Sequence, residues 1–200
     1  MKRRMLIMLA SVILTACGGG TETKQTTAPP VEATPAVAQT QPFSKTVELH
    51  GISFKVESPN SATGNKVTIT PAGLQVSNES VTVDANGEVI GAEIGDLNID
   101  QSPEVYVYAR GADKRASLIA YGTNSKKSMS QIYLPELDPQ SKEAAGFNGE
   151  DEFAVVESTL VHRFPIFEAG QKTGKMRQFQ LKLKPGEAGW VLKTDKVVEY

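Results

Sequence analysis

The side chains best suited to chemistry in this chain are two histidines, one cysteine and a run of three acids. They are His50, His162, Cys17 and the acids at 150–152. The hydrolase signatures G-x-S-x-G, H-E-x-x-H and S-x-x-K are absent, as is a glycine-rich loop for phosphate. Adjacent acids are typical of a solvated turn rather than of the paired carboxylates of a glycosidase. We therefore expect a protein that is not an enzyme.

The cysteine has a distinctive setting near the start of the chain. Basic residues occupy positions 2–4, an apolar run extends from Met5 to Leu14, and small residues precede Cys17. The run is shorter than the ~20 residues that span a bilayer. The pattern resembles the signal and cleavage box of bacterial lipoproteins. This resemblance implies a signal peptide at 1–16 and lipid on the Cys17 thiol.

The lipoprotein resemblance also implies a location. Several acyl chains, at ~0.8 kcal/mol per buried CH₂, anchor a protein stably to a membrane. Position 18 is Gly rather than Asp, which by analogy with enteric sorting rules implies the periplasmic face of the outer membrane. Residues 17–42 are rich in Thr, Pro and Ala and contain no aromatic residue. They predict a flexible tether with an end-to-end distance of roughly 25 to 30 Å.

Charge excludes one class of partner. Without residues 1–16, the chain keeps 18 basic and 23 acidic residues. A net negative chain without a pervasive basic surface is not expected to bind anionic partners, that is, nucleic acid or anionic lipid.

Alternation of apolar and polar residues dominates residues 43–200. A strand at 178–184 would direct Phe179, Leu181 and Leu183 inward and leave the residues between them in water. Similar runs lie at 53–56, 67–69, 81–83 and 105–108.

The links between these runs favour an all-β meander. Asn86–Gly87 is a pair typical of a tight hairpin turn, and no segment shows a helical stripe over three turns, although 139–145 could form one or two turns. We expect an antiparallel β-sandwich or barrel in a single domain, with at most short helical turns. Edge strands of an open sandwich can pair between copies, so a homodimer is a further prediction.

One loop has oxygen-bearing side chains at the spacing of a calcium site. They are Asp96, Asn98, Asp100 and Glu104. Side chains at positions 1, 3, 5 and 9 of a loop can converge on one Ca²⁺. The alternative, which the sequence favours, is an Asx-type turn closed by its own side chains, because Gln101 stands where a glycine would ease the turn.

A second loop, 110–116, carries three cations and one acid between two predicted strands. Such a basic tip suits an acidic cleft, because complementary charge speeds encounter and arginine can pair with a carboxylate through two hydrogen bonds. The alternative is an ordinary charged hairpin tip. The candidate contact residues are Arg110, Lys114, Arg115, Ser117 and Tyr121.

Several segments together resemble the periplasmic inhibitors of invertebrate-type (I-type) lysozyme, which are small β-sandwich proteins of Gram-negative bacteria. The segments are 95–97, 103–108, 130–135, 146–153, 160–167 and 173–179. The resemblance implies that the chain binds a lysozyme and inserts the loop 110–121 into its active cleft. The family has Ser and Gly where this chain has Arg110, Lys114 and Arg115, and only Ser117 and Tyr121 keep the family's residue types. The alternative function is a calcium-stabilised structural or binding module of the envelope without inhibitory activity.

Overall fold

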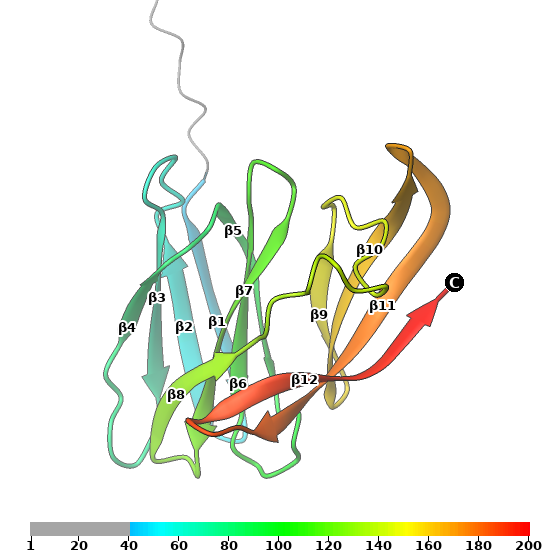
Figure 1. Ribbon diagram of the computed structural model, residues 1–200. Helices are drawn as coiled ribbons and strands as arrows, with labels where there is room; N and C mark the ends of the chain where they lie inside the picture. Colours follow the sequence, from blue (N-terminus) through cyan, green and yellow to red (C-terminus); the bar gives the residue numbers. More distant parts are fainter. Residues whose placement is uncertain (1–40) are drawn as a thin grey trace, which may run out of the picture. The chain divides into compact units, whose positions relative to one another are not determined.

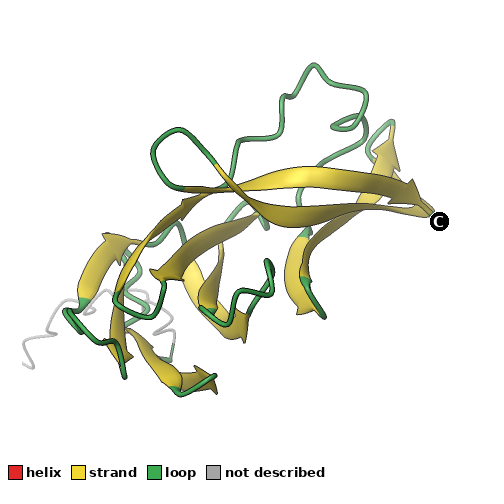
Figure 2. Cartoon of the chain, turned by 90° about the horizontal axis from the view of Figure 1, so that it is seen from below, coloured by secondary structure: helices red, strands yellow, loops and turns green. Residues whose placement is uncertain are grey.

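A computed structural model describes residues 41–200 of the chain. This part contains twelve β-strands. Figure 2 shows only strands and loops in it, with no helix. The prediction of an all-β fold is therefore confirmed. The predicted signal peptide, Cys17 and nearly all of the predicted tether lie outside the described residues. Contacts between residues group all of the described residues into one unit.

The strands form three meanders of four consecutive strands each (Figure 1). The first meander forms a sheet of its own, and the other two join in one sheet with the order β5-β6-β7-β8-β12-β11-β10-β9. The first contains β1 (Phe43–Leu49), β2 (Ile52–Ser58), β3 (Lys66–Ala72) and β4 (Val81–Asp84). The second contains β5 (Glu88–Gly95), β6 (Glu104–Arg110), β7 (Ala116–Asn124) and β8 (Ser128–Tyr133). The third contains β9 (Glu152–Val156), β10 (Thr159–Glu168), β11 (Gln171–Pro185) and β12 (Trp190–Glu199).

The eight-stranded sheet curves into a nearly closed barrel. The two meanders of this sheet, the second and third of the chain, meet through a short parallel pairing of β8 with β12. In this pairing Ile132 lies opposite Trp190. All other strand pairs are antiparallel, so this pairing is the one exception to the predicted antiparallel order within residues 41–200. On the opposite side, the Glu93 carboxylate of β5 accepts hydrogen bonds from Tyr108 Oη at 2.7 Å and from the Val155 N–H of β9 at 2.6 Å. A side chain therefore links the two end strands of the sheet.

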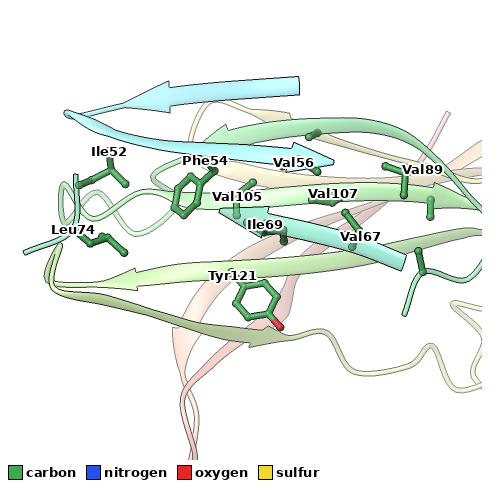
Figure 3. Close-up of a cluster of buried hydrophobic side chains, with 13 residues drawn as sticks. Ile52, Phe54, Val56, Val67, Ile69, Leu74, Val89, Val105, Val107 and Tyr121 are labelled. Atoms are coloured by element: carbon green, nitrogen blue, oxygen red, sulfur yellow. The ribbon is translucent and has the colours of Figure 1, made fainter. Parts of the chain in front are cut away.

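Strand β6 is buried on both faces and separates two hydrophobic cores. Its odd-numbered residues, such as Val105 and Val107, face the first meander, and Figure 3 shows them between the strands. Its even-numbered residues Tyr106 and Tyr108 face the barrel interior, where they pack with β10, β11 and β12. The strand predicted at 105–108 is thus present, but both of its faces are buried, so its Val and Tyr residues alternate between two cores rather than between a core and water.

The inward residues predicted for the 178–184 strand are confirmed. Phe179, Leu181 and Leu183 are each 4% exposed and pack in the barrel core. Their alternation with polar residues is the pattern expected of a strand with one wet face.

The prediction of a hairpin at Asn86–Gly87 was wrong. Strand β4 pairs with β3, and β5 pairs with β6, so these two residues carry the chain from one sheet to the other. Gly87 has a φ of +100°, and a Cβ there would lie 2.1 Å from the carbonyl oxygen of Arg110. Both the positive φ and the close approach of the two backbones require glycine at this crossing.

Candidate partner-binding site

The predicted basic loop is the tip of the β6–β7 hairpin. The turn is closed by backbone hydrogen bonds from Gly111 N to Arg115 O at 2.9 Å and from Lys114 N to Gly111 O at 3.0 Å. The Asp113 carboxylate accepts a further bond from the Arg115 N–H at 3.1 Å. Local bonds therefore fix the shape of the tip.

The tip is also tied to the loop that leads into β9. The Glu150 N–H donates to Lys114 O at 2.9 Å, and the Ala116 N–H donates to Asp151 Oδ1 at 2.8 Å. Arg110 donates through Nη1 to Lys114 O and through Nη2 to Asp151 O, both at 3.0 Å. Arg110 therefore helps to hold the tip, and its contact with a partner stays a prediction.

Lys114 and Arg115 remain on the surface. Their side chains are 70% and 56% exposed. Lys114 Nζ lies 3.4 Å from Glu150 Oε1, and the Arg115 guanidinium lies 5.1 Å from the centre of the Phe147 ring. Exposed ion pairs of this kind contribute little to stability, so these two cations are free to exchange their partners for those of another molecule.

The other two predicted contact residues do not share this exposure. Ser117 is half-buried, and its hydroxyl donates to the Asn86 carbonyl at 3.4 Å. Tyr121 is 7% exposed and packs in the core between the two sheets, as Figure 3 shows. Its assignment as a partner contact is therefore corrected: β7 directs this side chain inward, where it packs near Ile69 and Val105.

Sequence reasoning missed the residue pair that anchors the tip, Asp151 and His162. His162 Nε2 and Asp151 Oδ2 are 2.7 Å apart, and their side chains are 14% and 2% exposed. The imidazole stacks on Phe153 at 4.2 Å between ring centres, and Phe147 meets it edge-on. A sequence signal for the histidine is the alternation of Leu160, His162 and Phe164, which places it on the same strand face as two apolar residues.

The carboxylate of Asp151 is kept ionised by its partners. Burial raises its pKa, but the hydrogen bonds from His162 and from the Ala116 N–H outweigh this effect and hold the pKa below the usual range. One buried carboxylate thus joins the hairpin tip, the β9 loop and the aromatic cluster of the barrel.

The three consecutive acids at 150–152 pair with different side chains and do not converge on one site. Glu150 pairs with Lys114 and Lys172, Asp151 pairs with His162, and Glu152 pairs with Arg163.

A groove of about 390 Å³ lies on the outer surface of β9, β10 and β11. Its lining residues include Gln178 and Gln180 but no histidine, cysteine or serine.

The predicted calcium loop has the hydrogen bonds of the alternative interpretation, an Asx-type turn. The Asp96 carboxylate accepts bonds from the Asp100 and Gln101 N–H groups at 3.0 and 2.9 Å. Asp100 accepts bonds from the Ser102 N–H and from the Asn98 side chain. Gln101 has a φ of +65°, as expected where a glycine would ease the turn.

Glu104 does not join the other three predicted calcium ligands. It is 1% exposed, and its Oε2 accepts the Leu97 N–H at 2.9 Å. Burial raises the pKa of Glu104 to about 8, so without a cation beside it the carboxyl holds its proton at pH 7. No group of three or more His, Cys, Asp or Glu side chains in residues 41–200 is placed to hold a metal. Asp96, Asn98 and Asp100 thus form the hydrogen bonds of a turn, Glu104 lies buried apart from them, and calcium binding by these four residues stays a prediction.

Comparison with known proteins adds no relative. No family model, no curated protein and no solved structure matches the chain. In the part of the chain that the structure describes, no helix is long and apolar enough to cross a membrane.

Proposed function

We propose that this protein is a lipid-anchored envelope protein that binds a lysozyme and inhibits it through the β6–β7 tip. The observation that carries the proposal is the pairing of two exposed cations, Lys114 and Arg115, with a backbone held in place by the buried Asp151. The resemblance to I-type lysozyme inhibitors supplies the class of partner.

A preordered tip favours binding for a physical reason. Ordering a loop on association costs free energy, and a loop that is already ordered avoids that cost. Lysozyme clefts carry catalytic carboxylates, so two cations on a fixed tip match the charge of such a cleft. The tip contacts of this proposal are Lys114, Arg115 and the adjacent backbone, with Tyr121 as part of the supporting core.

The test is a cell-wall lysis assay. The chain is titrated against I-type, chicken-type and goose-type lysozymes, and stoichiometric inhibition of one class, expected to be the I-type, supports the proposal. The double variant Lys114→Glu/Arg115→Glu should lose inhibition by at least tenfold, since reversed charges oppose an acidic cleft. Association should also slow as salt rises, because charge steering is screened beyond about 8 to 10 Å.

The matched control is the double variant Lys193→Glu/Lys196→Glu, which reverses two exposed lysines on β12. It changes net charge by the same amount as the tip variant, so a general charge effect would affect both variants equally. Lack of inhibition of all three lysozyme classes, or full inhibition by the tip variant, would refute the mechanism.

The membrane anchor is tested separately. Cys17→Ser should release the chain from the outer-membrane fraction, because the thiol that carries the lipid is lost. An unchanged membrane fraction would contradict the proposed anchor without bearing on lysozyme binding.

A further inference from the structure

The outward face of β11 and β12 carries four lysines, which we call the lysine face. They are Lys182, Lys184, Lys193 and Lys196. The neighbouring residues Leu181, Leu183 and Leu192 are at most 4% exposed and point into the barrel, so strand alternation directs Lys182, Lys184 and Lys193 outward. A register shift between Gln180 and Leu181 places Lys196 opposite Gln180, on the same outward side.

The lysine face is not neutralised by the protein itself. Within residues 41–200 none of its four members forms an ion pair. Lys182 Nζ donates to Ser158 O and Thr159 Oγ1, both at 2.7 Å, which are uncharged oxygens. The acids nearest along the chain, Glu187, Asp195 and Glu199, make no salt bridge to it, and Glu199 pairs with Arg177 instead. Other cations of the domain, such as Arg163 and Arg177, do have carboxylate partners.

Two of these lysines occupy directly opposed backbone positions on neighbouring strands. Lys182 lies opposite Lys193 in the β11–β12 register. Like charges at directly opposed positions destabilise a sheet. The domain is acidic overall, with 17 basic and 21 acidic residues in positions 41–200, so four unpaired cations on one face form a local surface of the opposite sign.

An exposed aromatic residue lies at the end of the same face. Tyr133 is 63% exposed and stands opposite Val191, which in turn stands opposite Lys184. This row crosses β8, β12 and β11 and combines an amphipathic ring, an apolar side chain and an ammonium group. Tyrosine prefers the interface between lipid and water, and lysine is attracted to lipid phosphates.

We propose that the lysine face and Tyr133 bind the phosphate headgroups of an anionic bilayer. This inference rests on the envelope location in the proposed function. A juxtamembrane lysine contributes only modestly to lipid binding, but a lipid-tethered domain experiences a high effective concentration of the surface. The predicted tether of residues 17–42 would keep the domain within roughly 25 to 30 Å of the lipid, so a weak face suffices to orient it.

The experiment uses the chain from residue 17 onward with Cys17→Ser, so that no acyl chain contributes. Sedimentation is measured with vesicles of phosphatidylcholine alone and with vesicles that also contain phosphatidylglycerol. We expect binding to the anionic vesicles only, although the chain is acidic overall. Binding should weaken at high salt, since exposed charges are screened. The Lys193→Glu/Lys196→Glu variant should bind at least roughly tenfold more weakly, because two lysine contacts are lost.

The tip variant Lys114→Glu/Arg115→Glu is the matched control and should bind anionic vesicles as the parent chain does. Equal loss in both variants, no binding to anionic vesicles, or equal binding to both vesicle types would overturn the proposal. Binding to an acidic polypeptide such as polyglutamate with none to vesicles would also overturn it. The lysis assay distinguishes the two proposals, because failure of vesicle binding with intact inhibition refutes the lipid face alone, and the reverse result refutes the inhibitor alone.

Discussion

The two ends of the β6 region each contain a buried carboxyl group, yet the two groups differ in charge. Glu104, at the start of β6, is 1% exposed, and burial raises its pKa to about 8. Asp151, beside the far end of β6, is 2% exposed, and its pKa is lowered. The difference comes from the partners. The Asp151 carboxylate contacts His162 and accepts the Ala116 N–H of the tip. Glu104 accepts the Leu97 N–H and lies near Asp96 and Asp100, whose charges oppose its ionisation.

The comparison shows why burial alone does not decide the state of an acid. Desolvation raises the pKa of both groups, and only an opposite charge or several donated hydrogen bonds reverses it. The ionised Asp151 carboxylate holds the tip against the barrel, while the neutral Glu104 carboxyl accepts a backbone hydrogen bond from the turn before β6.

Removing the ionised carboxylate should produce the largest effect. Asp151→Ala leaves the Ala116 N–H and His162 without their partner, and we expect a loss of about 3 kcal/mol in the free energy of unfolding. Urea denaturation measures it. Glu150→Ala, at a surface position next to it, should change stability far less. A variant as stable as the parent would show that Asp151 does not anchor the tip.

The same residue predicts a pH dependence. The folded pKa of Asp151 lies below the unfolded value of about 3.9. Its contribution to stability is therefore present above that value and is lost as the pH falls through the folded pKa. Asp151→Ala should lose less stability than the parent over this acidic range, in a urea series at decreasing pH. Parallel curves for both chains would contradict the lowered pKa.

Glu104→Gln should act in the opposite pH range. Folded Glu104 holds its proton up to about pH 8, whereas the unfolded carboxyl loses it near 4.3. The parent therefore loses stability as the pH rises between these values, and glutamine does not titrate. We expect the variant to exceed the parent by at least about 1 kcal/mol near pH 9 and to match it near pH 4. The same difference at both pH values would show that Glu104 does not titrate with a raised pKa.

Two lysines at opposed positions on the outer face of the sheet test the effect of charge outside the core. Lys193→Glu places an acid opposite Lys182 in the β11–β12 register, where two cations now lie at opposed positions, and should raise stability by about 0.5 kcal/mol. Thermal unfolding at low salt would detect it. The same substitution should weaken vesicle binding, so stability and binding move in opposite directions. A fall in stability would show that the two lysines do not repel each other.

The smallest expected effect concerns calcium. Because Asp96 and Asp100 already accept backbone hydrogen bonds and Glu104 is neutral, millimolar Ca²⁺ or a chelator should leave the melting temperature unchanged. A rise in melting temperature with Ca²⁺ would restore the calcium module as the better function, by the linkage of ligand binding to folding.

The sequence alone was sufficient to predict side-chain directions on strands with one solvent-exposed face. It was not sufficient for strands whose two faces are both buried. Phe179, Leu181 and Leu183 alternate with polar residues, so their direction could be read directly. Tyr121 could not be placed, because the β5–β8 meander has cores on both sides and either direction is apolar. The pair of Asp151 with His162 depends on how β9 lies along β10, and neither residue has a local pattern that reveals the other.

The arrangement of the three meanders has a consequence for the rate of folding. Nearly every strand pairs with a strand next to it in the chain, so most pairings close short loops and carry a low entropic cost. The exception is the parallel contact between β8 and β12, which spans two residue pairs and joins parts of the chain far apart in sequence. We expect the meanders to form early and this junction to form late, so substitutions at Trp190 should mainly change the unfolding rate.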